Sequence, residues 1–208
     1  VMQGDFIKLL EEEQECVTWK SIAHNVPKGI LSFALKASTN TLNTPDNLKR
    51  WGKIKLANCA LCGNHCTLEH ILNFCKISLD QKRFTWRHDS VLKYLSSEIL
   101  KPDNLEMYAD IPKYWLNGST IPPDVLYTLL RPDMIFLDRK LKKIIMLELT
   151  CSFERNIDAA NIRKKTKYQD LKEDLEKAGF HVTLLPFEIG SRGQVTKRNR
   201  IALENTFK

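Results

Sequence analysis

Four side chains in one short segment have the types and the spacing of a metal site. Cys59 and Cys62 are separated by two residues, and a histidine and a further cysteine follow at His70 and Cys75. Three thiolates and one imidazole fill the tetrahedral shell of zinc and leave no position open for water. We therefore predict that Cys59, Cys62, His70 and Cys75 bind a structural zinc ion.

The fourth ligand has alternatives. Cys66 and His70 lie four residues apart and would share a helical face, so Cys66 competes with Cys75 for the metal, and His65 is also within reach. Four of the six cysteines fall between positions 59 and 75. Such local clustering is typical of metal ligation in a reducing intracellular compartment, and we expect no disulfide framework.

A second pattern is acidic and lies on two predicted strands. Asp133 follows a proline at the head of one strand, and Glu148 lies inside the next, within 144–150. Side chains alternate along a strand, so Glu148 shares a face with apolar neighbours, where a carboxylate is costly to bury unless it is paired or bound to a cation. We expect Asp133 and Glu148 to bind Mg²⁺ or Mn²⁺ together. The alternative is an ion pair between Glu148 and a structural Arg or Lys.

A predicted long helix over 154–178 brings two lysines towards these carboxylates. At about 100° per residue, Lys164 lies in the middle of the core-facing stripe that also carries Ile157 and Leu171. We expect Lys164 to reach the carboxylate pair and to orient or deprotonate an attacking water, with Lys167 steadying a phosphate. The alternative is that Lys164 extends along the helix to solvent.

The two carboxylates resemble a known nuclease signature. Pro132-Asp133, followed by Glu148 after fourteen intervening residues, is similar to the PD-(D/E)XK motif. Thr150 stands where that motif has its lysine. The resemblance implies a nuclease-like α/β core similar to that of archaeal Holliday-junction resolvases, with Asp133 and Glu148 as ligands of the catalytic metal.

The lysines and the cysteines extend the resemblance. Lys164-x2-Lys167-Tyr168 is similar to the helix-borne lysine element of the restriction-like endonucleases at the C-terminus of site-specific non-LTR retrotransposon polyproteins. The C-x2-C-x7-H-x4-C spacing upstream is the second hallmark of those proteins. Residues 87–89 and 190–193 also look like segments of that family.

The family resemblance implies a function. It implies a metal-dependent DNA endonuclease that nicks target DNA in the nucleus and so primes reverse transcription during retrotransposon integration. It assigns Lys164 and Lys167 to catalysis together with the two carboxylates, and it implies target DNA, element RNA and the reverse transcriptase domain of the same polyprotein as partners. The alternative, suggested by Thr150, is a nucleic-acid-binding module of a retrotransposon-derived protein that does not cut.

Further side chains are candidates for contact with nucleic acid. Three of them have a structural alternative: His88 lies on the apolar stripe of its helix, Arg87 suits a surface ion pair with Asp89, and Arg192 lies in 190–193, which suits a turn that needs positive φ. The candidates are Arg87, His88, Arg131, Tyr168 and Arg192.

Three regions must position these residues. We expect a helical linker over 1–57, a zinc module over 58–80 and a nuclease-like domain over 81–208. The opening region reads as an amphipathic helix with Phe6, Leu9 and Leu10, followed by a second helix near 30–37. The domain should contain a helix over 81–100, an irregular loop over 101–123, a hairpin of strands over 129–137 and 143–151, the long helix, a strand over 181–187 and a final basic helix. This order predicts an α/β fold with a small mixed sheet flanked by helices.

The net charge points to a polyanionic partner. The chain has 32 Lys and Arg against 25 Asp and Glu, which leaves +7, and ten basic against four acidic residues fall within 139–172. The first fifteen residues are net −4, where a signal peptide would be basic and then apolar. We expect no membrane association.

Overall fold

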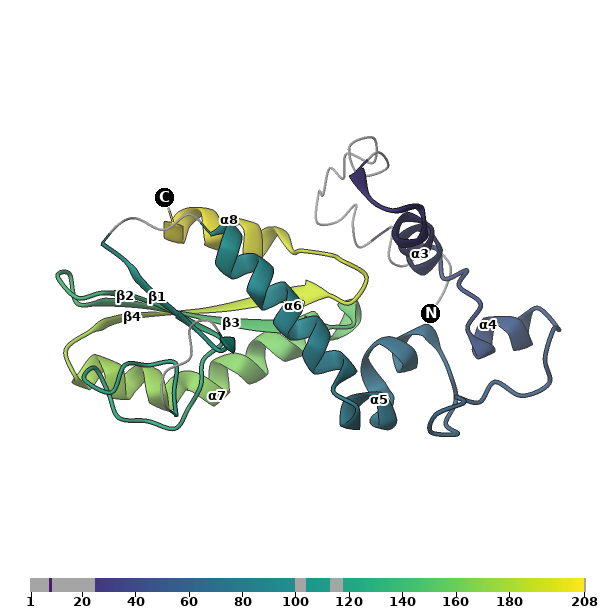
Figure 1. Cartoon of the computed structure of the whole chain (residues 1–208), viewed down its shortest axis with the longest axis horizontal. Helices are drawn as coiled ribbons and strands as arrows, with labels where there is room; N and C mark the ends of the chain where they lie inside the picture. Colours follow the sequence, from purple (N-terminus) through teal and green to yellow (C-terminus); the bar gives the residue numbers. More distant parts are fainter. Residues whose placement is uncertain (1–7, 9–24, 100–103, 113–117, 208) are drawn as a thin grey trace.

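The computed structural model describes residues 8, 25–99, 104–112 and 118–207 and has a mixed α/β fold (Figure 1). Its sheet has four strands in the order β1-β2-β3-β4. The pairs β1–β2 and β2–β3 are antiparallel, and the pair β3–β4 is parallel. The mixed sheet predicted from the sequence is thus confirmed, with the following bounds: β1 Glu106–Ala109, β2 Met134–Asp138, β3 Lys143–Ser152 and β4 His181–Gly190.

Helices cover both faces of the sheet. The long helix α7 (Ile157–Lys177) joins β3 to β4 and lies on one face, while α6 (Arg83–Glu98) and α8 (Lys197–Phe207) lie on the other (Figure 1). A helical crossover is what two parallel neighbouring strands require. Shorter helical segments complete the described chain: α3 Lys28–Ser38, α4 Pro45–Arg50, η1 His70–Phe74, α5 Lys76–Asp80 and η3 Glu154–Asn156.

The core has two layers because the central strand β3 is buried on both faces. Ile145 and Leu147 pack towards Leu92 of α6, whereas Ile144 and Met146 pack towards α7. A strand covered on both sides reads as a nearly continuous apolar run, as β3 does. Glu148 interrupts this run on the α7 face, where the sequence predicted it.

Two predictions about the elements were wrong in detail. The region 101–123, expected to be an irregular loop, contains strand β1, which pairs with β2 at the sheet edge. The strand expected from 129 begins only at Met134. Pro132 has no backbone N–H to donate, and its carbonyl accepts the hydroxyl of Thr120 instead of a strand partner.

The helices expected from residue 81 onward are confirmed. The helices expected over 81–100 and 154–178 and the final basic helix are present as α6, η3 with α7, and α8. The amphipathic opening helix with Phe6, Leu9 and Leu10 lies outside the described residues, and so does most of the expected linker before residue 25. Within the described part of the chain, no helix has both the length and the apolar character needed to span a membrane.

Candidate functional site

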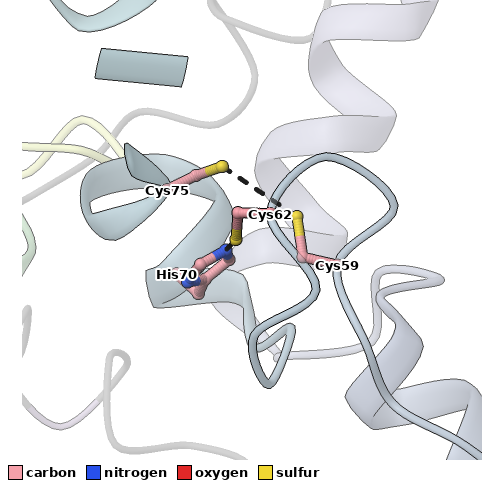
Figure 2. A group of neighbouring side chains, drawn as sticks. All are labelled: Cys59, Cys62, His70 and Cys75. Carbon is pink, nitrogen blue, oxygen red and sulfur yellow. Dashed lines mark hydrogen bonds between the residues drawn. The ribbon is translucent and has the colours of Figure 1, made fainter. Parts of the chain in front are cut away.

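The side chains of Cys59, Cys62, His70 and Cys75 converge on one point (Figure 2). Their four potential ligand atoms all lie within 4.8 Å of one another. Sγ of Cys59 is 3.9 Å from Sγ of Cys75, and Sγ of Cys62 is 3.3 Å from Nε2 of His70. Sulfurs at about 2.3 Å from a tetrahedral zinc ion stand about 3.8 Å apart. The Cys/His cluster formed by these four residues could therefore hold a metal ion and is compatible with structural zinc.

Local backbone structure prepares the Cys/His cluster for a metal. Gly63, at φ 76°, turns the chain after Cys62 so that its N–H donates to the carbonyl of Cys59. The N–H of Cys62 lowers the pKa of Cys59, and the hydroxyl and N–H of Ser78 lower the pKa of Cys75. Metal ligation requires thiolates, so both effects favour binding.

The two competing ligands stay outside the Cys/His cluster. Cys66 is buried beside it, and burial raises the pKa of its thiol to about 12. His65 lies 2.9 Å from the carboxylate of Asp46. Of the two sets left open by the sequence, the side chains that meet are those of the set with Cys75.

The segment carrying the cluster is docked against the end of β3. Asn73, in η1, donates from Nδ2 to the carbonyl oxygen of Cys151 at 3.1 Å. Arg87 of α6 donates to the carbonyls of Leu72 and Cys151 at 2.8 and 3.3 Å. The Arg87 guanidinium, a candidate for DNA contact from the sequence, thus joins the cysteine segment to the sheet.

Asp133 and Glu148 face each other across strands β2 and β3. The backbone N–H of Asp133 donates to Oε1 of Glu148 at 3.0 Å, and the N–H of Leu149 donates to Oδ2 of Asp133 at 2.8 Å. Just before β2 begins, two backbone N–H groups thus donate to carboxylate oxygens instead of to carbonyl oxygens of the neighbouring strand. Asp133 is 8% exposed and Glu148 is fully buried. The two carboxylates that the sequence analysis expected to lie together are therefore close to each other.

Lys164 reaches both carboxylates from α7. Its Nζ lies 2.7 Å from Oε2 of Glu148 and 3.5 Å from Oδ2 of Asp133. Burial, followed by the negative charge of Asp133, raises the pKa of Glu148 to about 7. Burial alone would lower the pKa of Lys164, but the two carboxylates raise it. The lysine in the middle of the core-facing stripe therefore balances buried negative charge.

His88 joins this group from the opposite side of the sheet. Its Nε2 lies 3.4 Å from Oδ2 of Asp133, and its Nδ1 lies 3.1 Å from the carboxylate of Asp89. Burial would lower the pKa of His88, but the hydrogen bond with Asp133 and then that with Asp89 raise it to about 9. His88 is therefore a cationic member of the site rather than an apolar core histidine.

The other two residues of the predicted lysine element, Lys167 and Tyr168, are hydrogen-bonded to each other. Lys167 donates from Nζ to the hydroxyl of Tyr168 at 2.8 Å, and that hydroxyl donates to the carbonyl of Arg131 at 3.2 Å. Tyr168 is 1% exposed and packs in the core on the α7 face, so its ring is a structural element in this conformation. The Arg131 guanidinium pairs with Asp110 at the protein surface.

Arg192 occupies a different environment from the one expected. Its guanidinium is 3% exposed, donates from Nε to Oε2 of Glu154 at 2.7 Å and stacks on Phe153. Glu154 lies so close to Gly190 that a Cβ there would be 2.5 Å from its Oε1. Arg192 is thus an internal side chain that holds the turn after β4, and in this conformation it is not available to a phosphate.

A third group of polar residues on the α7 face was missed by the sequence analysis. Glu188 of β4 is fully buried, accepts from Nδ2 of Asn161 at 2.9 Å and lies 3.4 Å from the guanidinium of Arg198. Its signal was the same as that of Glu148, an acidic residue inside an apolar strand run. The parallel pairing of β3 and β4 places Glu188 opposite Thr150.

The geometry combines two kinds of site. The Cys/His cluster has the closed ligand set of a structural site, whereas the second group joins the buried acids Asp133, just before β2, and Glu148 of β3 to the half-buried bases Lys164 of α7 and His88 of α6. Perturbed pKa values in such a group are typical of sites that handle protons or cations. Comparison with models of known protein families and with curated protein sequences finds no match to this chain.

Proposed function

We propose that this chain is a Mg²⁺- or Mn²⁺-dependent DNA endonuclease that nicks target DNA to prime reverse transcription during retrotransposon integration. The observation that carries the proposal is the meeting of Lys164 with Asp133 and Glu148, since the three residues come from separate elements and match the nuclease-like pattern of the sequence. The partners that fit this role are target DNA, element RNA and a reverse transcriptase domain. The endonuclease would act in the nucleus.

The buried carboxylates suit a hard cation. Asp133 and Glu148 offer oxygen ligands on one side, and phosphate and water would complete the shell. The bound ion would lower the pKa of a coordinated water and stabilise charge on the phosphate. Burial raises the pKa of Glu148, and a bound cation would lower it again because the positive charge favours the ionised carboxylate.

Lys164 would act on the attacking water during hydrolysis of the phosphodiester. Water oxygen bonds to phosphorus and its proton passes to solvent; the bond from phosphorus to the 3′ oxygen breaks, and that oxygen takes up a proton from solvent, which leaves a 3′ hydroxyl as a primer end. Lys164, whose pKa the two carboxylates raise, orients the water as a cation, and His88, held as a cation by Asp133, stabilises negative charge on the phosphate.

Plasmid nicking tests the proposal. Wild-type protein should convert supercoiled DNA to the open circle with Mg²⁺ or Mn²⁺ and not with a chelator, and Asp133→Ala and Lys164→Ala should be at least about 100-fold slower. Lys165→Ala, which removes an exposed charge from the same helix, is the matched control and should cut at the wild-type rate. An inert wild type that binds DNA tightly would overturn the enzymatic proposal and favour the non-cleaving binding module, for which Thr150 in place of the strand lysine is the supporting observation.

A further inference from the structure

A cavity of about 510 Å³ lies off the carboxyl end of β3, two residues beyond Glu148. Four elements wall it: η1 with Asn73 and Phe74, the end of β3 from Thr150, η3 with Asn156, and the first turns of α7 to Arg163. Its volume is within the range of about 300–1,000 Å³ that is typical of ligand pockets. Crevices outside the carboxyl ends of strands are also where open α/β sheets bind ligands.

Residues with unpaired polar atoms surround this cavity. Seven buried side-chain atoms in the described part of the chain lack a hydrogen-bond partner, and three of them belong to residues that line the cavity: Oδ1 of Asn73, Oγ1 of Thr150 and Oγ of Ser152. Thr150 itself is only 9% exposed. A buried polar group without a partner destabilises the fold, so residues that carry three such groups around one cavity mark it as a candidate ligand site. Two hydroxyls suit an anion, and the amide oxygen suits an N–H donor.

The rim adds a cation and an aromatic ring. Arg163 is exposed on α7 next to Lys164, and the ring of Phe74 is 58% exposed. Among the described residues that line the cavity, none is acidic. A guanidinium, hydroxyls and an open ring together match the parts of a nucleotide, with its phosphate at one end and its base at the other.

We propose that this cavity binds one unpaired nucleotide of the strand to be cut, next to the scissile phosphate. Arg163, Thr150 and Ser152 bind its phosphate, and its base stacks on Phe74. Oδ1 of Asn73 accepts a hydrogen bond from an exocyclic amino group of the base, so adenine, guanine or cytosine is preferred over thymine. The inference rests on the proposed endonuclease function and names a substrate subsite for it.

The Cys/His cluster then acquires a role in substrate binding. Asn73 and Phe74 lie in the chain between His70 and Cys75, and Asn73 is also bonded to the end of β3. A metal bound to His70 and Cys75 would hold both ends of this wall. Loss of the metal should therefore weaken binding of the unpaired nucleotide more than binding of ordinary duplex.

Equilibrium binding tests the subsite without cleavage. The 208-residue chain, loaded with zinc, is titrated with a labelled duplex that carries one bulged cytosine and with the same duplex fully paired, with Ca²⁺ in place of Mg²⁺. Base stacking on an aromatic side chain is worth about 1–3 kcal/mol, so the bulge should bind about 5- to 150-fold more tightly. Phe74→Ala should remove this preference. Tyr94→Ala, which removes an exposed ring of α6, should keep it.

Thr150→Val separates ligand binding from structural effects. Valine has nearly the same shape, and removal of a buried hydroxyl without a partner should leave the thermal midpoint unchanged or raised. Binding of the bulged duplex should nevertheless fall. Equal affinities for the two duplexes, or a bulge preference that survives both Phe74→Ala and Thr150→Val, would mean that water alone fills the cavity and would overturn the subsite.

The nicking assay distinguishes failure of the subsite from failure of the proposed function. A wild type that nicks plasmid but shows no bulge preference keeps its endonuclease activity and loses the subsite. A wild type with a Phe74-dependent bulge preference but no nicking keeps the nucleotide-binding cavity and loses the assigned cleavage.

Discussion

Nζ of Lys164 lies 2.7 Å from Oε2 of Glu148, although the two side chains come from a helix and from the central strand of the sheet. The cation that contacts Glu148 thus comes from α7, and the strand position two residues beyond Glu148 carries Thr150. Thr150 is one of the residues that line the cavity beyond the carboxylates.

Metal binding at the carboxylates should be measurable without DNA. A ligand at about 100 times its dissociation constant stabilises a folded protein by about 2.7 kcal/mol. Saturating Mn²⁺ should therefore raise the thermal midpoint of the wild type, and Asp133→Asn should abolish the rise. Asp170→Asn removes an exposed carboxylate from α7 and should not affect it. An equal rise in wild type and Asp133→Asn would show that Mn²⁺ binds elsewhere.

His88 should remain protonated well above neutral pH in the metal-free protein. Its pKa is raised to about 9 by Asp133 and Asp89 despite its burial. The contribution of this contact to stability should be complete below about pH 6.5 and be lost as the pH rises through about 9. Imidazole resonances followed by NMR should give the raised pKa in wild type and in Ser90→Ala, and a lower one in Asp133→Asn. An unchanged titration in Asp133→Asn would contradict the contact.

Zinc content should follow the four residues of the Cys/His cluster. Elemental analysis should find about one zinc per chain, and Cys59→Ser and Cys75→Ser should each lose it. Cys66→Ser should retain the metal because its sulfur lies outside the group. If Cys75→Ser retained zinc and Cys66→Ser lost it, the fourth ligand would be Cys66 and not Cys75.

Removal of Arg192 should destabilise the fold strongly. Glu154 is fully buried beside it, so Arg192→Ala leaves an uncompensated charge and should lower the free energy of unfolding by about 3–5 kcal/mol. Lys177→Ala breaks an exposed pair with Asp174 and should change this free energy by at most about 1 kcal/mol. Urea unfolding monitored by circular dichroism measures both. Similar small losses would show that the Arg192 pair carries no special weight.

Periodicity alone predicted the central part of the candidate site. The alternation of β3 placed Glu148 on an apolar face, and the helical period placed Lys164 opposite it. These positions depend on regular geometry within single elements, which a sequence displays directly. The Cys/His spacing was informative for the same reason, because both halves of the motif are local.

Features that depend on distant partners were not predictable. β1 has only four residues and gains its hydrogen bonds from β2, so its own composition carries little signal. Arg192 looks like a surface arginine until its partner Glu154, 38 residues away, is known. Arg87 likewise bonds to carbonyls that no side-chain pattern reveals.

The surroundings of Arg192 limit how the chain could be shortened. Besides Glu154, its guanidinium approaches the carbonyl of Ala37 at the end of α3, and Asn73 bonds to the end of β3. These contacts cross both of the boundaries expected near residues 57 and 80. A recombinant fragment that starts at residue 81 would therefore keep every strand yet lose one wall of the cavity and part of the packing around Phe153. The smallest piece that preserves the site runs from α3 through α8.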